Sequence, residues 1–400
     1  MSKVKILVVI YSLGNGGGEK ALVNMLNSID PKMYEVDLQL FERKGINLQF
    51  VPEWVHILSP LFPNGMLSSK QQFMQLIKRG KLGVALQKLY FMFISRNKNS
   101  REKTLYVWKS LRHLCPANSK VYDVIISGMH GLSTYYALDC LNGKKRIAWV
   151  HTDYSKIPRV EDDFEYFKRA DTVVTVSPHC QEALQNAFPR LNNIVVLQNI
   201  NCPKMIEKMS LEQSKEDCFP DEARYHFVSI GRLIPLKGFD MAIEAASKLK
   251  ENGLNFKWYF FGEGEEKNNL IHRAQEIGVS EFVCFMEATS NPYPYIKNAD
   301  LIIQTSRYEG KSMVLDEAKI LKKPIVTTAY DSVKDQIVDK LNGLIVPINA
   351  DGIADGILDI LQNETLRNSL VENLKKEENG QVKLIAQYNG VFGACNRGVW

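Results

Sequence analysis

Residues 301–321 read LIIQTSRYEGKSMVLDEAKIL, and this stretch decides the fold of the chain around it. The apolar run Leu301–Thr305 predicts a buried strand, and Ser312–Leu321 predicts the helix that follows it. Glu309 stands in the turn between them, and Glu317 lies about one and a half turns into the helix. A helix N-terminus offers backbone N–H donors and a positive dipole end to an anion, while a carboxylate accepts hydrogen bonds from hydroxyls. A sugar joined to a diphosphate fits both halves of this corner.

Two earlier strand-to-helix loops carry residues that suit the same ligand. The predicted strand Tyr225–Ile230 leads into Gly231-Arg232-Leu-Ile-Pro-Leu-Lys237-Gly238, and the strand Lys257–Phe261 leads into Gly262-Glu-Gly264. Loops that follow parallel strands lie at the same edge of a sheet, where ligands bind. Two cations there can neutralise a diphosphate leaving group without a metal. Each motif alone is more often a solvated face or a plain turn, so their order on successive strands carries the inference.

This ordered set resembles the nucleotide-sugar half of the retaining glycosyltransferases of GT-B fold, in their large fourth sequence family. The family pattern reads here as Gly231-Arg232, Lys237-Gly238, Gly262-Glu-Gly264, Ala299-Asp300 and Glu309-(seven residues)-Glu317-Ala318. The resemblance covers about residues 225 to 347 well and the whole chain more loosely. It implies an α/β protein with two doubly wound Rossmann-like domains that face a central cleft. It also implies retention at the anomeric carbon.

The resulting hypothesis assigns a role to each residue of the second half. Arg232 and Lys237 stabilise the departing diphosphate, Glu309 holds sugar hydroxyls, and Glu317 holds the nucleotide ribose. Further donor-binding positions are Gly231, Gly262, Gly264, Lys311, Ser312, Met313 and Val314, the last four through backbone N–H groups. Glu287, and Lys311 after Glu309-Gly310, depart from the family pattern and leave the base and the sugar of the donor open.

The first half offers a glycine loop and a histidine. Gly16, Gly17 and Gly18 follow the first predicted strand and open a helix, so the backbone there can approach a phosphate or a sugar. A dinucleotide fingerprint would need glycine at position 19, where Glu19 stands. His151, at the end of the fourth strand, resembles the family histidine that touches the donor sugar. Asp153 is expected to order His151 or to engage the acceptor, and His130, after the third strand, is a further neighbour.

Composition and patterning fit a two-domain protein. The 400 residues, 24% of them charged, are ordinary for a soluble chain with two or three domains. Alternating strands and helices predict parallel, doubly wound sheets. We expect an acceptor-binding domain over 1–200, a linker at 201–221 within a nucleotide-sugar-binding domain over 201–380, and a last helix in 381–400. In GT-B relatives that helix returns to the first domain.

The cysteines and the apolar runs indicate the compartment. Seven scattered cysteines, with no Cys-x-x-Cys, favour a reduced cytosolic setting. The N-terminal apolar run is too short for a signal peptide and predicts a first strand. No run approaches the ~18 apolar residues of a membrane span.

Positive charge is concentrated between Met66 and Lys120. Twelve Lys and Arg residues face one acid, Glu102, so the segment carries 12 − 1 = +11, and it is also rich in aromatic and aliphatic residues. A basic helical stretch with aromatic side chains is typical of a surface that lies on anionic lipid. The alternatives are a solvated face over an ordinary core helix and, without a recognised module, nucleic acid, which we do not expect as a partner.

Elimination narrows the reaction class. The chain has no Asp-x-Asp for a divalent ion, no zinc pattern, no nucleophile elbow and no Walker loop. We therefore expect metal-independent and cofactor-free transfer from a nucleoside-diphosphate sugar. The family resemblance, together with the basic segment, implies a UDP-sugar as donor and a lipid-linked saccharide in bacterial surface polysaccharide synthesis as acceptor, at the cytoplasmic face of the membrane. The alternatives are a UDP-sugar 2-epimerase of the same fold and a non-catalytic nucleotide-sugar-binding regulator.

Overall fold

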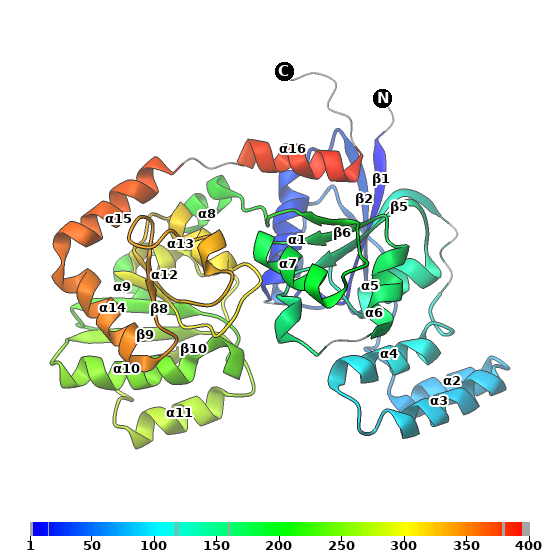
Figure 1. Cartoon of the computed structure of the whole chain (residues 1–400), viewed down its shortest axis with the longest axis horizontal. Helices are drawn as coiled ribbons and strands as arrows, with labels where there is room; N and C mark the ends of the chain where they lie inside the picture. Colours follow the sequence, from blue (N-terminus) through cyan, green and yellow to red (C-terminus); the bar gives the residue numbers. More distant parts are fainter. Residues whose placement is uncertain are drawn as a thin grey trace. The chain divides into compact units, whose positions relative to one another are not determined.

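The chain forms two compact units, each built on one parallel sheet (Figure 1). The computed structural model describes residues 3–14, 16–116, 118, 120–158, 161–377 and 381–393. Unit 1 comprises Met1–Ile200 with Gln381–Trp400, and unit 2 comprises Asn201–Gly380. Parallel strands joined by helices are what alternating apolar strands and amphipathic helices require, and the predicted doubly wound α/β class is confirmed.

The described strands of unit 1 form a seven-stranded sheet in the order β3-β2-β1-β4-β5-β6-β7, with every pairing parallel. Ile6 of β1 lies opposite Val36 of β2 on one side and Val124 of β4 on the other. The strands are β1 (Val4–Ile10), β2 (Tyr34–Leu40), β3 (His56–Ile57), β4 (Val121–Ser127), β5 (Asn142–Val150), β6 (Thr172–Thr175) and β7 (Ile194–Val196).

Helices cover the sheet of unit 1 and add a separate group after β3 (Figure 1). The helices are α1 (Gly17–Ser28), α2 (Ser69–Lys78), α3 (Leu82–Ile94), α4 (Ser100–Leu111), α5 (Leu132–Cys140), α6 (Glu161–Arg169), α7 (Pro178–Ala187) and α16 (Gln381–Phe392), with 3-10 turns η1 (Ile46–Phe50) and η2 (Tyr154–Lys156). No helix within the described ranges is both long enough and apolar enough to cross a membrane.

The described strands of unit 2 form a six-stranded sheet in the order β10-β9-β8-β11-β12-β13, again all parallel. The strands are β8 (Tyr225–Ile230), β9 (Phe256–Phe261), β10 (Val283–Met286), β11 (Leu301–Gln304), β12 (Ile325–Thr328) and β13 (Leu344–Val346). The helices are α8 (Pro203–Met209), α9 (Lys215–Cys218), α10 (Phe239–Glu251), α11 (Lys267–Glu276), α12 (Tyr293–Asn298), α13 (Met313–Ile320), α14 (Ala350–Gln362) and α15 (Glu364–Lys376), with 3-10 turns η3 (Pro235–Lys237) and η4 (Val333–Asp335).

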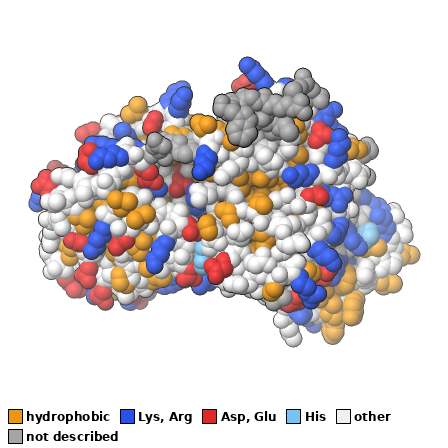
Figure 2. Space-filling view, turned by 45° about the horizontal axis from the view of Figure 1, so that its top comes forward, with side chains coloured by type: hydrophobic (Ala, Val, Ile, Leu, Met, Phe, Trp, Pro, Cys, Tyr) orange, Lys and Arg blue, Asp and Glu red, His pale blue; other side chains and the backbone are white. Residues whose placement is uncertain are grey.

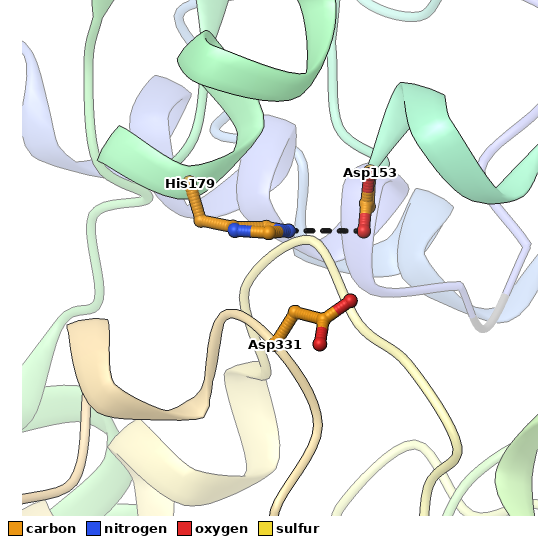
Figure 3. A group of neighbouring side chains, drawn as sticks. All are labelled: Asp153, His179 and Asp331. Carbon is orange, nitrogen blue, oxygen red and sulfur yellow. Dashed lines mark hydrogen bonds and ion pairs between the residues drawn. The ribbon is translucent and has the colours of Figure 1, made fainter.

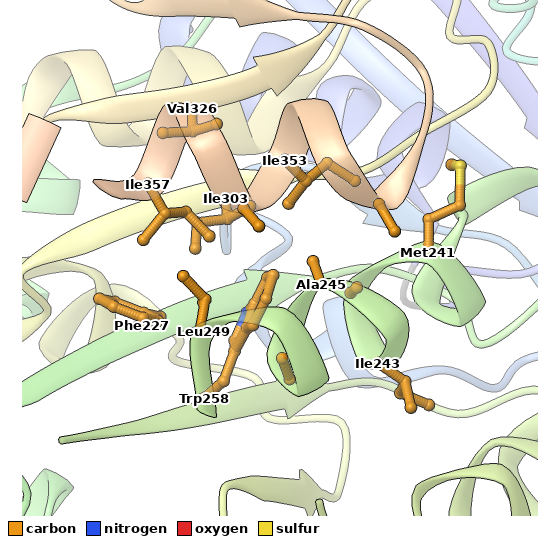
Figure 4. Close-up of a cluster of buried hydrophobic side chains, with 14 of the residues drawn as sticks. Phe227, Met241, Ile243, Ala245, Leu249, Trp258, Ile303, Val326, Ile353 and Ile357 are labelled. Atoms are coloured by element: carbon orange, nitrogen blue, oxygen red, sulfur yellow. The ribbon is translucent and has the colours of Figure 1, made fainter. Parts of the chain in front are cut away.

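The core of unit 2 is closed by α10 and α14 on one face of its sheet (Figure 4). Leu249 of α10 and Ile357 of α14 pack there with Phe227 and Trp258 from the strands. The buried Trp258 Nε1–H donates to Ser229 Oγ at 3.0 Å, so its polar atom is satisfied. This packing fixes the strands whose loops form the candidate site.

Both sheets reverse their strand order once, between β1 and β4 in unit 1 and between β8 and β11 in unit 2. In such sheets the loops after the two strands at the reversal diverge and leave a crevice at the carboxyl edge, where ligands bind. The loops to inspect are therefore those after β1, β4, β8 and β11.

Two expectations about single elements were wrong. The predicted linker at 201–221 contains α8 and α9, because Ile206 and Phe219 are buried in a core cluster of unit 2. The sequence pattern over Gln71–Ile94 predicts a single helix, but the structure has two there, because Gly80 adopts φ +71° and ends α2.

Candidate active site

A lysine and a glutamate meet at the strand-order reversal of unit 2. Lys237 ends η3 in the loop after β8, and Glu309 lies in the turn after β11. Lys237 Nζ forms an ion pair with Glu309 Oε1, although 72 residues separate them in sequence. The reversal between β8 and β11 explains why these two predicted residues are brought together.

The Glu309 carboxylate is held from one side. Besides Lys237, its Oε1 accepts from Gln304 Nε2 at 2.8 Å and from Ser306 Oγ at 2.6 Å. Ser332 Oγ donates to the Glu309 carbonyl at 2.8 Å. Oε2 takes no hydrogen bond from any residue that the structure describes. A carboxylate oriented in this way presents one oxygen that can accept hydrogen bonds from hydroxyls.

Arg232 supplies a second cation in the same loop. Its side chain is exposed and forms no ion pair with the described part of the chain. The backbone around it is fixed, because Leu233 N–H donates to the Glu263 carbonyl at 3.0 Å. Arg232 and Lys237 therefore lie in one loop. The Lys237 ammonium is paired to Glu309, whereas the Arg232 guanidinium has no such partner among the residues described.

The start of α13 differs from the prediction that its backbone donors are free. Ser312 N–H donates to Gln336 Oε1 at 2.7 Å, and Gln336 Nε2 donates back to the Ser312 carbonyl at 2.8 Å. Ser312 Oγ also donates to Gln304 Oε1 at 2.6 Å and caps α13 at Leu315 N–H. A ligand that uses the Ser312 N–H must displace the Gln336 side chain.

Lys311 is a paired cation and not a free one. Its side chain is 6% exposed, and its Nζ lies 2.6 Å from Asp316 Oδ2. Met313 is buried, Val314 is half-buried in the first turn of α13, and Glu317 is only 1% exposed. The positions predicted to bind the donor thus form the buried framework of this helix start.

Glycines hold the neighbouring loops at backbone contact. A Cβ on Gly262 would lie 1.9 Å from the Gly231 carbonyl oxygen, and one on Gly264 would lie 2.1 Å from the Leu233 carbonyl oxygen. Gly238, at φ +66°, would place a Cβ 2.1 Å from the Thr305 carbonyl oxygen. The predicted glycines therefore have a packing role, since only a residue without a side chain lets these loops meet.

In unit 1 the glycine loop after β1 lies against His151. Gly16 precedes α1, and Gly17 is its exposed first residue. A Cβ on Gly18 would lie 2.6 Å from Met129 Cε and 3.3 Å from His151 Cγ. The structure thus brings the predicted loop and the predicted histidine together at the carboxyl edge of the sheet.

His151 and His130 are neutral histidines with unsatisfied nitrogens. The His151 ring stacks on Trp149 at 5.2 Å, and neither of its buried nitrogens has a hydrogen-bond partner among the residues described. Burial and the nearby His130 lower the pKa of His151 to about 3. Burial and Arg101 lower the pKa of His130 to about 4. At neutral pH both rings can donate or accept a hydrogen bond but carry no charge.

Asp153 orients a different histidine from the one expected. Figure 3 shows its carboxylate facing His179 of α7, with Nε2 3.1 Å from Asp153 Oδ2. The other oxygen accepts from Ser155 N–H at 2.9 Å and from Ser155 Oγ at 2.7 Å. The expectation that Asp153 orders His151 was therefore wrong.

Sequence reasoning missed Gln304, Ser306 and Gln336, which organise the carboxylate and the helix start. Gln304 ends the buried strand β11. A polar residue at the carboxyl end of an apolar run is the signal that could have found it.

Comparison with known proteins finds relatives among the glycosyltransferases. Residues 212–377 match the family model described as glycosyl transferases group 1. The matched residues lie within unit 2, which carries Lys237 and Glu309. The lipopolysaccharide core biosynthesis glycosyltransferase LpsE of Rhizobium meliloti is 28% identical over 58% of this chain and 66% of its own length.

Two further comparisons cover nearly the whole of the chain. The N-acetylgalactosamine-N,N'-diacetylbacillosaminyl-diphospho-undecaprenol 4-alpha-N-acetylgalactosaminyltransferase of Campylobacter jejuni is 23% identical over 93% of this chain and 94% of its own. Anabaena HepE, solved in complex with UDP and glucose, superposes with a TM-score of 0.70 at 15% identity, covering 98% of this chain and 100% of HepE. The last comparison shows the fold, and the relatives show a transferase.

Proposed function

We propose that this glycosyltransferase moves a sugar from a UDP-sugar to a lipid-linked saccharide, with retention at the anomeric carbon, in bacterial surface polysaccharide synthesis. One observation carries the proposal: Lys237 pairs with Glu309 at the strand-order reversal of unit 2, and Arg232 lies exposed in the same loop as Lys237. Two cations and an oriented carboxylate match a diphosphate joined to a polyhydroxylated ring.

The proposed reaction exchanges one bond to the anomeric carbon for another. The bond from that carbon to the diphosphate oxygen breaks, and a bond to the acceptor hydroxyl oxygen forms on the same face. The hydroxyl proton passes to the departing diphosphate, whose negative charge Arg232 and Lys237 stabilise. Glu309 Oε2 accepts from sugar hydroxyls, and neutral His151 hydrogen-bonds the donor sugar. Since side-chain cations stabilise the leaving group, the proposal needs neither a metal nor a cofactor.

The remaining assignments are proposed by analogy with the relatives. HepE was solved with UDP and glucose, and the name of the Campylobacter jejuni enzyme includes a diphospho-undecaprenol carrier. LpsE is named for lipopolysaccharide core biosynthesis. These names support UDP as the nucleotide, a lipid carrier for the acceptor and a surface glycan as the product. The +11 segment 66–120 supports a place on the cytoplasmic face of the membrane.

Ligand-induced thermal shifts in EDTA test the donor site. We expect UDP or a UDP-sugar to raise the melting temperature, whereas GDP, ADP and NAD leave it unchanged. In Arg232→Ala, turnover should fall about a hundredfold or more, because one contact to developing charge is worth about 3–4 kcal/mol. Arg224→Ala is the matched control, because Arg224 is also exposed but precedes β8 at the opposite end of that strand.

Four results would contradict parts of the proposal. Stabilisation by NAD alone, or by none of the ligands, would contradict the proposal that unit 2 binds a nucleotide sugar. Near wild-type turnover in Arg232→Ala would remove the role of that arginine. Activity that is lost in EDTA and restored by a divalent ion would contradict metal independence. An inverted linkage in the NMR spectrum of the product would contradict retention.

A further inference from the structure

The polarity of helix α3 is reversed relative to an ordinary surface helix. Its outward face carries Leu82, Leu86, Leu89, Tyr90 and Phe93, a spacing that places all five on one side, and Leu86 and Phe93 are 67% and 69% exposed. Its inward face carries Lys88, which is 2% exposed. A helix built to face water places its lysine outside and its leucines inside.

The inward lysine has a built partner. Lys88 Nζ donates to Gln72 Oε1 of α2 at 2.7 Å, and Gln72 is itself 3% exposed and donates to the Leu67 carbonyl at 2.7 Å. Burial lowers the pKa of Lys88. Because the buried polar atoms are paired, the rotational setting of α3 is fixed, and its leucines are held outward.

The hairpin of α2 and α3, residues 69–94, combines this apolar face with positive charge only. It contains five Lys or Arg residues and no Asp or Glu. Lys70, Lys78, Arg79 and Lys81 are exposed, as are the apolar Met74, Ile77 and Met92. Figure 2 shows hydrophobic side chains gathered at the end of unit 1 that carries α2 and α3, with Lys and Arg beside them.

We propose that the hairpin 69–94 lies in the plane of an anionic bilayer, with the outward face of α3 inserted among the lipids and the cations on headgroups. This inference deepens the membrane placement proposed above and rests on it. An exposed apolar stripe bordered by cations matches the boundary between acyl chains and negative headgroups. A second copy of the hairpin fits less well, since pairing two apolar faces would bring two sets of uncompensated cations together.

Insertion is tested with the full-length chain carrying Leu86→Trp, mixed with phosphatidylcholine vesicles with or without phosphatidylglycerol. We expect a blue-shifted tryptophan emission, and quenching by brominated lipid, only with the anionic vesicles and less at high salt. Leu341→Trp is the matched control, because Leu341 is an exposed leucine of unit 2, and its emission should not change.

Vesicle sedimentation with substituted chains completes the test. We expect Leu86→Gln with Phe93→Gln to weaken binding to anionic vesicles at least about tenfold. Val338→Gln with Leu341→Gln, a matched pair of exposed apolar positions in unit 2, should leave binding unchanged. Equal binding of both double variants, or a Leu86→Trp signal unaffected by vesicles, would overturn the proposal. The proposal would also be overturned if the wild type did not bind vesicles but formed a concentration-dependent dimer, and if Leu86→Gln with Phe93→Gln abolished that dimer. No donor or acceptor is present, so failure here leaves the transfer reaction standing.

Discussion

Two histidines of unit 1 show how a site can gain hydrogen-bonding groups without gaining charge. His130 and His151 follow adjacent parallel strands, so their rings approach one another at the carboxyl edge of the sheet. Burial lowers the pKa of both rings, helped by Arg101 at His130 and by His130 at His151, so both rings stay neutral at neutral pH. Neutral rings can bind hydroxyls, but they do not attract a diphosphate by charge.

The lowered pKa of His130 predicts a loss of stability in mild acid. Its pKa is about 4 in the folded chain against an ordinary value of 6.5, so stability is complete above about pH 6.5 and falls as the pH drops toward 4. The slope of the free energy of unfolding against pH approaches about 1.4 kcal/mol per pH unit for each such histidine. Urea denaturation at about pH 7 and pH 5 measures the free energy of unfolding at each pH. Its fall between the two pH values should be smaller in His130→Gln than in the wild type.

The control for this measurement is His272→Gln, at an exposed position of α11. Its free energy of unfolding should fall between the two pH values by as much as that of the wild type. An unchanged slope in His130→Gln would show that burial does not hold this ring neutral.

The charged residues of the site could be predicted at this scale, but their hydrogen bonds could not. Glu309, Lys237 and Arg232 stand out because they follow strands of one half of the chain in the order of the family pattern. Gln304 and Gln336 look like ordinary polar residues, and only the packed backbone shows that they orient Glu309 and occupy the Ser312 N–H. The partner of Asp153 is likewise set by where α7 packs.

At the scale of elements, the loops after β8, β9 and β11 form one interlocked body. Thr305 Oγ1 donates to the Lys237 carbonyl at 2.8 Å, and Arg307 N–H donates to the Leu236 carbonyl at 2.8 Å. Gly262 and Gly238 allow the close approaches. The position of Lys237 relative to Glu309 therefore depends on glycines that touch no charge.

Gly238→Ala should damage stability far more than Gly253→Ala. The two glycines have nearly the same backbone, φ +66° and +71°, but a Cβ on Gly238 meets the Thr305 carbonyl oxygen while one on Gly253 meets nothing within 4 Å. Left-handed strain alone costs about 1–2 kcal/mol. Overpacking adds about 1–3 kcal/mol more at Gly238. Thermal or urea unfolding measures the difference, and equal losses would mean that the loops do not interlock.

The strands were more predictable than the helix boundaries. Apolar runs such as Tyr225–Ile230 have the observed bounds because a strand covered on both faces must be apolar throughout. The break at Gly80 and the helices α8 and α9 were missed. A glycine can continue a helix or end it, and α8 and α9 are short and contribute only single residues such as Ile206 and Phe219 to the core.

At the scale of the whole molecule, unit 1 is built from both ends of the chain. Tyr388 and Phe392 of α16 are buried in a core cluster of unit 1 with Tyr34 and Trp149. The Tyr34 hydroxyl donates to Asn389 Oδ1 at 2.7 Å. The helix is thus a structural part of the sheet domain that begins some 380 residues earlier.

Removing the Tyr388 side chain should destabilise unit 1 selectively. Tyr388→Ala should cost about 3–5 kcal/mol, as for other large buried rings. Tyr388→Phe should cost only about 1 kcal/mol, for the hydrogen bond to the Gln198 carbonyl at 3.0 Å. Hydrogen exchange by mass spectrometry should show lost protection in β1 and β2 but not in β8 and β11. Equal loss in both units would contradict separate cores.

The split composition of unit 1 also sets the order in which the chain can finish folding on the ribosome. All of unit 2 is synthesised before α16, so its core can close while the nascent unit 1 still lacks Tyr388 and Phe392. Until translation passes residue 392, the surface around Tyr34 and Trp149 remains uncovered. The core of unit 1 therefore stays incomplete during the synthesis of unit 2 and closes only when α16 has been made.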